Sequence, residues 1–287
     1  MDGHSYPTSI ADISQWSRDN RTTTLQANIR FMEYVVLNCI GSNATTHRGM
    51  VLKGGNALRF AFQSPRSTKD LDFTVAGNEI PDDTERLRSL LNDALRFAER
   101  RFRVKAKCQH VERKPRPNPG STRPTYSVSV AYQFEADRYF HNFEERNNIS
   151  TVIPVEVSFN DRICETCVWT GVSSVQVSSL EDILAEKLRS LLQQRTRNRN
   201  RCQDVYDIAK YVRQHTIDRD KIGRFLVEKA IIREIDARKS SFDDVIRAMA
   251  FEDYDTRIRE EAPDDFIPFD DAWQDVVSLV QSLNIPD

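Results

Sequence analysis

The stretch that decides the fold is Asp70-Leu71-Asp72-Phe73-Thr74-Val75. Apolar and polar side chains alternate along it with a period of two, which is typical of a β-strand with one buried face. We expect Leu71, Phe73 and Val75 to enter the core, while Asp70 and Asp72 project together from the other face. Two carboxylates on one face repel each other, and a bound divalent cation removes that cost. The stretch therefore predicts a strand that carries a metal-binding aspartate pair.

A second stretch, Ile153-Pro154-Val155-Glu156-Val157-Ser158-Phe159, repeats this arrangement. Its apolar residues form one face, and Glu156 lies on the opposite one. If the two strands are neighbours, Glu156 faces the same side as Asp70 and Asp72. Three acidic groups suit a phosphoryl-transfer centre built on Mg²⁺ or Mn²⁺, in which Glu156 could also act as general base. A solvated sheet face is the alternative interpretation of both stretches.

A glycine pair precedes the aspartates. Met50-Val51-Leu52 is a short apolar strand that runs into Lys53-Gly54-Gly55-Asn56, and a helix with Ala57, Leu58 and Phe60 follows. Glycines in such a turn leave backbone N–H groups exposed, and together with a helix N-terminus these groups can bind a phosphate oxygen. A tight turn with no ligand is the alternative. The order of strand, Gly-Gly, helix, short loop and Asp-x-Asp favours a nucleotide phosphate.

The rest of the chain divides in two. Strand signals continue to about residue 177, after which helical periodicity dominates. We expect an α+β fold with a mixed-sheet lobe at 1–177 and an all-helical lobe at 178–287, and the cleft between such lobes is a natural place for a ligand. The expected helices cover 22–40, 83–101, a segment opening at Ser178 or Ser179, 202–215, 218–236, 241–251 and 270–282; the expected strands lie near 102–111, 125–135 and 151–159, with a loop at 114–124.

Composition narrows the class of protein. The chain has 287 residues, 39% hydrophobic and 29% charged, which excludes a wholly disordered chain. No stretch approaches the ~18 apolar residues of a membrane helix, and the N-terminus has no signal-peptide pattern. Five cysteines are too few for a disulfide framework. We therefore expect a cytoplasmic protein with no membrane partner.

Charge is strongly segregated although 41 Lys+Arg nearly balance 43 Asp+Glu. A basic run spans Glu186 to Arg201, and its last part carries Arg195, Arg197, Arg199 and Arg201. These arginines are candidate RNA-binding residues, because phosphate contacts dominate RNA affinity. Residues 251–287 are strongly acidic and could receive a basic partner protein. Solvated helix faces are the alternative interpretation of each run.

Lys187 borders an apolar stripe in the first helix of the second lobe. Its ammonium either extends to solvent along its aliphatic stem or points into a cleft, where it can meet triphosphate oxygens. Asp204 and Asp207 are three residues apart on the next helix and share a face. One of them can hold Lys187 or orient Arg201. An ordinary carboxylate pair near a helix N-terminus is the alternative.

Together these residues resemble the AbiEii/MenT nucleotidyltransferase toxins, of the DNA polymerase β-like nucleotidyltransferase superfamily. The resemblance is carried by Lys53-Gly54-Gly55-Asn56-Ala57-Leu58-Arg59 and by Ser67-Thr68-Lys69-Asp70-Leu71-Asp72-Phe73. A later family motif is matched by Lys187-Leu188 with Leu191, followed by Asp204-Val205-Tyr206-Asp207. The matched motifs span about 53 to 207.

The resemblance implies magnesium-dependent transfer of a nucleotidyl group from an NTP. In characterised relatives the acceptor is the 3′ end of tRNA, and the toxin is paired with an antitoxin encoded nearby, in type IV toxin–antitoxin or phage-defence operons. The resemblance also implies that residues 1–177 form a nucleotidyltransferase-like lobe and that the helical lobe completes its active-site cleft. Carried over by position, Thr68 matches a family serine or threonine, Asp70 and Asp72 match the metal-binding pair, and Lys187 and Asp204 match the lysine and first aspartate of the later motif. The expected catalytic residues are therefore Asp70, Asp72, Lys187 and Asp204, to which the strand pattern adds Glu156 as the candidate third carboxylate. The NTP-binding residues are Lys53, Gly54, Gly55, Asn56, Arg59, Thr68 and Lys187, and the metal ligands are Asp70, Asp72 and Glu156.

Three positions depart from the family pattern. Asn56 stands where relatives usually have Ser or Thr, Gln194 stands where the lysine-leucine motif usually closes with an arginine, and Gln203 replaces a basic residue before Asp204. The last two affect the expected phosphate contacts more than metal binding.

Rival functions differ in what they predict. The same scaffold could nucleotidylate a protein hydroxyl or a small molecule, and a transfer assay that separates RNA from protein distinguishes this from RNA modification. A non-catalytic nucleotide- or RNA-binding module predicts binding that survives loss of magnesium and of the aspartates. A structural partner protein would use the acidic C-terminal segment as its docking surface.

Overall fold

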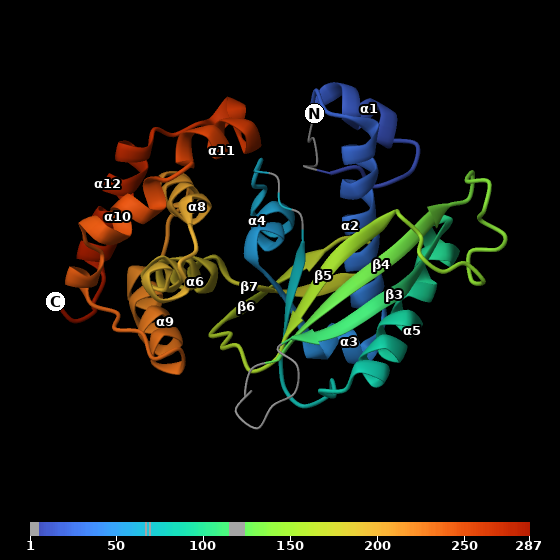
Figure 1. Ribbon diagram of the computed structural model, residues 1–287, viewed down its shortest axis with the longest axis horizontal. Helices are drawn as coiled ribbons and strands as arrows, with labels where there is room; N and C mark the ends of the chain where they lie inside the picture. The colour runs from blue at the N-terminus through green and yellow to red at the C-terminus, as the bar shows by residue number, and fades with distance from the viewer. Residues whose placement is uncertain (1–5, 67, 69, 115–123) are drawn as a thin grey trace. The chain divides into compact units, whose positions relative to one another are not determined.

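The computed structural model describes residues 6–66, 68, 70–114 and 124–287 (Figure 1). The described residues fall into two compact units. The first, called here the sheet unit, comprises Met1–Ser64, Thr68–Asp161 and Thr166–Val177; the second, the helical unit, comprises Pro65–Ser67, Arg162–Glu165 and Ser178–Asp287. Two short segments that precede Ser178 in the sequence thus belong to the unit that is built mainly from residues 178–287.

The sheet unit contains a seven-stranded mixed sheet in the order β3-β4-β5-β2-β1-β7-β6. Its central strand β2 is antiparallel to β1 and parallel to β5, so segments about 80 residues apart in sequence lie side by side. The mixed sheet with its many helices confirms the expected α+β fold. The strands are β1 Met50–Lys53, β2 Leu71–Val75, β3 Val104–Lys114, β4 Thr125–Phe134, β5 Val152–Ser158, β6 Thr166–Thr170 and β7 Ser174–Ser178.

The period of two in the sequence is visible in the burial of β5 and of the first half of β2; Val75, which was expected in the core, is only half-buried, and Thr74 is fully buried. Leu71 and Phe73 are fully buried, whereas Asp70 is exposed and Asp72 half-buried. In β5 the apolar positions are buried and Glu156 is exposed. Apolar burial of about 25 cal/mol per Å² therefore determines which face of each strand turns inward.

Helices of the sheet unit begin at polar caps. The Thr23 and Asp83 side chains accept hydrogen bonds from the first turns of α2 and α5, which satisfies backbone N–H groups that have no partner within the helix. These two helices pack against each other, and α5 packs on β3 (Figure 1). The helices of this unit are α1 Ile13–Asp19, α2 Thr24–Ser42, α3 Ala44–Gly49, α4 Gly54–Phe62 and α5 Thr84–Phe102.

The helical unit is organised around α6, whose N-cap Ser179 accepts from the Asp182 N–H. Leucines of the apolar stripe are buried, and α6 packs against α8 and α9. The helices are α6 Leu180–Leu192, α7 Gln194–Arg197, α8 Cys202–Gln214, α9 Arg219–Ile232, α10 Asp244–Phe251, α11 Tyr254–Glu261 and α12 Phe269–Ser282, with 3₁₀ turns η1 Lys239–Ser241 and η2 Pro263–Asp265.

Several elements were not expected. The strands β6 and β7 and the helices α1, α3, α7 and α11 are short, so each has too few residues to establish a period. The strand expected at 102–111 extends to Lys114, which belongs to β3 and not to the expected loop. The rest of that loop, residues 115–123, and Ser67 and Lys69 of the family motif lie outside the described residues. In the described part of the chain no helix has the length and apolarity to cross a membrane.

Candidate active site

A row of polar side chains crosses the sheet where β1, β2 and β5 meet. In the strand register Lys53 is opposite Asp72, and Asp72 is opposite Glu156. Residues in register on neighbouring strands point to the same face, so these three side chains share one face of the sheet. The row continues through Ser127 of β4 to Glu112 of β3. The condition that placed Glu156 beside the aspartates, adjacency of the two strands, is met.

Gly54 lies directly against the Asp72 carboxylate. Its φ is +71°, in the left-handed region that favours glycine. A Cβ added at this position would lie 2.6 Å from Asp72 Oδ2, well inside van der Waals contact. The helix α4 begins at Gly54, so the backbone N–H groups of its first turn start beside this carboxylate. A glycine is therefore required here both by backbone conformation and by space.

Buried polar side chains donate hydrogen bonds to the main chain of the loop before β2. Asn56 is fully buried, and its Nδ2 donates to the Asp70 carbonyl oxygen at 2.7 Å. The Thr68 carbonyl accepts from Arg30 Nη1 at 2.8 Å. The Thr68 Oγ1 atom is buried and has no hydrogen-bond partner among the described residues. Arg59 is buried as well, close enough for its charge to act on Glu33.

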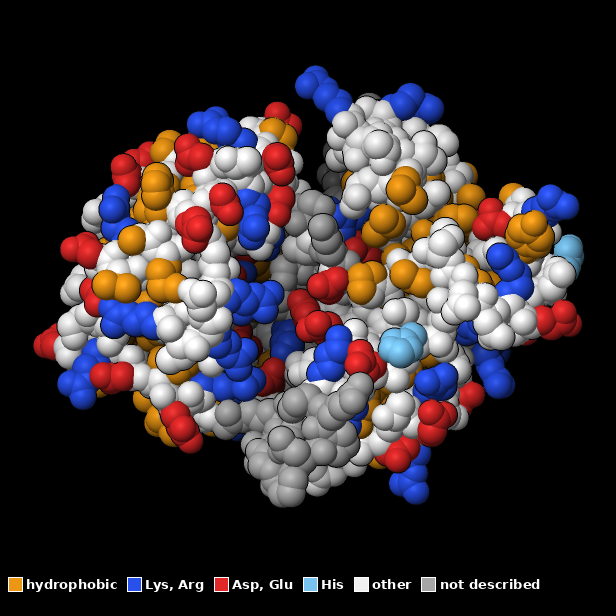
Figure 2. Space-filling view, in the orientation of Figure 1, with side chains coloured by type: hydrophobic (Ala, Val, Ile, Leu, Met, Phe, Trp, Pro, Cys, Tyr) orange, Lys and Arg blue, Asp and Glu red, His pale blue; other side chains and the backbone are white. Residues whose placement is uncertain are grey.

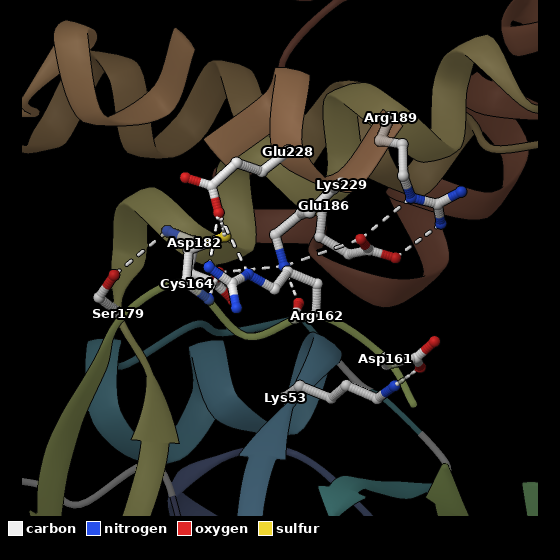
Figure 3. A network of polar contacts seen from close by, with 10 residues as sticks. All are labelled: Lys53, Asp161, Arg162, Cys164, Ser179, Asp182, Glu186, Arg189, Glu228 and Lys229. Carbon is white, nitrogen blue, oxygen red and sulfur yellow. Dashed lines mark hydrogen bonds and ion pairs between the residues drawn. The ribbon is translucent and has the colours of Figure 1, made fainter. Parts of the chain in front are cut away.

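Lys53 takes part in an ion pair on the same face. Its Nζ lies 2.6 Å from Oδ2 of Asp161, a residue that follows β5, and both side chains are about one-fifth exposed (Figure 3). Asp161 adds a carboxylate to this end of the sheet that the sequence patterns did not single out. A D-x-D pattern or a strand period could not have found it, because it lies in an irregular segment after the strand.

The donor set at this site suits a hard cation. Among the residues that the structure describes, no three His, Cys, Asp or Glu side chains are grouped as a ready metal site. Neighbouring carboxylates are nevertheless present at Asp72 and Glu156, and Asp70 precedes them on the same chain. Mg²⁺ is commonly held by only one or two carboxylates, with waters and substrate phosphates as its other ligands. The residues present therefore fit such an ion.

A buried charge cluster occupies the helical unit. Lys187 Nζ lies 2.7 Å from Asp204 Oδ1 and 2.8 Å from Asp207 Oδ2. Arg66 makes two hydrogen bonds to Asp207, at 2.9 and 3.0 Å, and a third to Glu261 at 2.9 Å. Lys187 is buried, so its ammonium does not extend to solvent, and both Asp204 and Asp207 hold it; contact with a triphosphate stays a prediction.

Burial and pairing act in opposite directions on the pKa values of this cluster. Burial lowers the pKa of Lys187, but Asp204 and Asp207 outweigh it and leave the pKa above its ordinary value. Burial raises the pKa of Asp207, but Arg66 and Lys187 outweigh it and leave the pKa below its ordinary value. Both groups are therefore charged at neutral pH. Sequence reasoning placed Lys187 with the aspartates but missed Arg66, which is 141 residues from Asp207 in the sequence.

The arginines after α6 have mixed surroundings. Arg195, Arg197 and Arg199 are exposed and Arg201 is half-buried. Arg195 is paired with Asp243. Burial, and then the charge of Arg233, lower the pKa of Arg197, and Arg189, Arg201 and Arg199 add to this effect. On the face shown in Figure 2, basic and acidic side chains are interspersed over the helical unit.

A second buried network attaches residues 162–165 to the helical unit (Figure 3). Lys229 Nζ lies 3.0 Å from Asp182 Oδ1 and donates to the Arg162 carbonyl at 2.6 Å. The Cys164 backbone N–H donates to Asp182 Oδ1 at 2.8 Å. Burial raises the pKa of the Cys164 thiol to about 12, so this cysteine is a poor nucleophile or metal ligand. The network is structural.

The mixed sheet thus carries Asp72 on β2, a glycine bend against it and a carboxylate on the adjacent strand β5, which are features from which the sequence predicted a nucleotidyltransferase-like lobe. The family model "Nucleotidyl transferase AbiEii toxin, Type IV TA system" matches residues 36–277. The chain belongs to this family, so it is a nucleotidyltransferase toxin of a toxin–antitoxin system. That membership implies an antitoxin partner and a nucleotide substrate, and enzymes of this class generally use divalent metal ions.

Two solved structures are similar to the chain at low sequence identity. A candidate nucleotidyltransferase from H. pylori is 15% identical, with a TM-score of 0.47 over 88% of this chain and 92% of that one. JHP933 from Helicobacter pylori is 13% identical, with a TM-score of 0.40 over 88% and 89%. No curated protein sequence matches the chain significantly.

Proposed function

We propose that this toxin transfers a nucleoside monophosphate from an NTP to the 3′ end of an RNA, with the tRNA acceptor stem as the acceptor, in a Mg²⁺-dependent reaction that Mn²⁺ can also support. The observation that carries the proposal is the register of β2 and β5. It sets Asp72 beside Glu156 on one face, with Gly54 against the Asp72 carboxylate.

In this proposal Asp70, Asp72 and Glu156 hold the metal. When bound, Mg²⁺ neutralises triphosphate charge and aligns the reacting oxygens. The backbone N–H groups at Gly54 and Gly55 and the hydroxyl of Thr68 bind phosphate oxygens. The buried Thr68 Oγ1 supports this assignment, because it has no hydrogen-bond partner among the described residues. Phosphate contacts by Lys53, Asn56 and Arg59 stay predictions from the sequence.

Glu156 is the proposed general base, since it is exposed and lies opposite Asp72 in the strand register. Its carboxylate takes the proton of the RNA 3′-hydroxyl as the O3′–Pα bond forms. The bond from Pα to the oxygen that bridges to the β-phosphate breaks, and pyrophosphate leaves with that electron pair. Fixed donors that stabilise developing charge commonly supply the largest part of such a rate enhancement.

The helical unit supplies the predicted pair Lys187 and Asp204. We propose that Lys187 is required for use of the triphosphate and that Asp204 keeps its ammonium charged and oriented, which the 2.7 Å contact supports. The exposed arginines at 195, 197 and 199, with the half-buried Arg201, are the proposed RNA contacts. Arg195 is paired with Asp243, whereas Arg197 lies close enough to Arg199 and Arg201 to be repelled by them, and RNA phosphates can neutralise this positive charge.

The test is a transfer assay with each labelled NTP and cell lysate, followed by separation of RNA from protein. We expect label in small RNA with the wild type, and loss of at least about 100-fold for Asp72→Ala and Glu156→Gln. Glu112→Gln is the matched control, because this glutamate belongs to the same cross-sheet row, two strands from Glu156. Label in protein would support the rival substrate, and full activity of Asp72→Ala would contradict the proposed metal site.

A further inference from the structure

A charged pair lies in the core of the sheet unit, on helix α2. Arg30 Nη1 contacts both carboxylate oxygens of Glu33, at 2.7 and 2.9 Å, and the two side chains are 2% and 0% exposed. Arginine and glutamate are almost never fully buried unless they are paired, and replacing such a pair by apolar side chains is often neutral for stability. Stability alone therefore gives no reason for this pair.

The pair is directed at the loop before β2. Arg30 Nη1 donates to the Thr68 carbonyl at 2.8 Å. Burial raises the pKa of Glu33, and the charge of Arg30 and the nearby Asn56 amide both act against this effect. The same Asn56 amide donates to the Asp70 carbonyl at 2.7 Å. Buried groups from α2 and α4 thus hold two backbone carbonyls, at Thr68 and at Asp70.

These two carbonyls flank the point where the first predicted metal ligand is placed. Asp70 is exposed and lies one residue before β2, so it is outside the strand ladder that fixes Asp72. Mutual repulsion of the two carboxylates favours a loop that moves Asp70 away from Asp72. Hydrogen bonds to its main chain from a rigid, buried framework oppose that movement. Groups that orient metal ligands commonly change metal affinity 10- to 100-fold when they are removed.

We propose that Arg30, Glu33 and Asn56 are positioning residues that fix the main chain at Thr68 and Asp70 and so preorganise the metal site; this rests on the proposed function. The pair acts through the loop and contacts neither substrate nor metal. The positioning role requires a group at position 33 whose two oxygens can both accept hydrogen bonds. In Glu33→Gln one carboxylate oxygen becomes an NH₂ group that faces a donor, Arg30 or Asn56, in a buried site.

The test measures Mn²⁺ binding to the full chain without nucleotide. The electron paramagnetic resonance signal of free Mn²⁺ reports how much of the ion remains unbound. We expect Glu33→Gln and Asn56→Ala each to weaken Mn²⁺ binding about 10-fold or more. The Mn²⁺ concentration for half-maximal transfer should rise in parallel, whereas the rate at saturating Mn²⁺ changes less. Arg30→Lys keeps the charge but has fewer donors, so it should give an intermediate shift.

Asp182→Asn is the matched control. It removes an equally buried carboxylate from an ion pair with Lys229 in the helical unit, so it lowers stability to a similar degree. We expect its Mn²⁺ affinity to equal that of the wild type. Wild-type affinity in folded Glu33→Gln and Asn56→Ala, or an equal loss in Asp182→Asn, would overturn the positioning role.

Asp72→Ala separates this outcome from failure of the proposed function. If Asp72→Ala binds Mn²⁺ like the wild type, the metal site itself is wrongly placed, and the positioning role falls with it. If Asp72→Ala loses Mn²⁺ while Glu33→Gln and Asn56→Ala do not, only the positioning role falls. Should Glu33→Gln fail to fold by circular dichroism, Asn56→Ala decides, because it leaves the Arg30–Glu33 ion pair intact.

Discussion

Replacement of Gly54 by alanine tests the geometry on which the site depends. A methyl group there would lie 2.6 Å from Asp72 Oδ2, whereas ordinary contacts begin at 3.4 Å, so the carboxylate must move by about 0.8 Å. A misplacement of about 1 Å in a catalytic constellation can cost about 100-fold in rate. The φ of +71° adds about 1–2 kcal/mol of backbone strain for a residue with a Cβ.

Gly77 provides the control for that strain. It has the same φ of +71°, and a Cβ there meets nothing within 4 Å. We expect Gly54→Ala and Gly77→Ala to lower the melting temperature of the protein by a similar amount, about 2–8 °C. Only Gly54→Ala should also lower nucleotide transfer, by about 10- to 100-fold, measured below the melting temperature of both variants.

The comparison of the two variants decides the question. If Gly54→Ala retains the activity of Gly77→Ala within about threefold, the position of the Asp72 carboxylate does not control the reaction, and the argument from the cross-sheet row is refuted. If both variants lose activity equally, strain in the unit rather than displacement of Asp72 is responsible.

Two further predictions concern the helical unit. Asp207→Asn leaves the charges of Arg66 and Lys187 buried without this partner and should cost about 3–5 kcal/mol in the free energy of unfolding, measured with urea. The folded pKa of Asp207 lies below its ordinary 3.8, so the stability that its ionised carboxylate contributes is present above that pH and is lost as the pH falls through the folded value. Asp207→Asn should therefore remove this part of the dependence of unfolding free energy on acid pH. An unchanged dependence in the variant would contradict the argument. Replacing Arg197 and Arg199 by alanine should weaken RNA binding. The slope of log K against log salt concentration, measured by titration at several salt concentrations, should fall in magnitude by about 0.7 for each phosphate that the variant no longer neutralises. An unchanged slope would exclude both arginines as RNA-binding residues.

Local pattern in the sequence was enough for most of the regular elements. The alternation at 70–75 and 153–159 predicted two strands and the face on which Asp72 and Glu156 lie, because side-chain direction in a strand depends only on position along it, whereas Asp70 lies one residue before β2. Ser179 and Asp83 were recognisable as helix starts because capping is also local: each side chain accepts a hydrogen bond from a backbone N–H three residues away. Elements of about five residues, such as β6, escaped because a period cannot be established over so short a length.

Contacts between distant segments were decided only by the tertiary structure. The sequence identified Asp72 and Glu156 separately, but their register required β5 to pair in parallel with β2, a choice made by the packing of the whole sheet. Arg30 and Glu33 were not singled out from the sequence, and only their burial and the contact of Arg30 with the Thr68 carbonyl connect them to the loop before β2. A sequence shows which side chains are charged and how long they are. Whether such a side chain is buried, and which groups it then contacts, depends on which surfaces the folded chain removes from water.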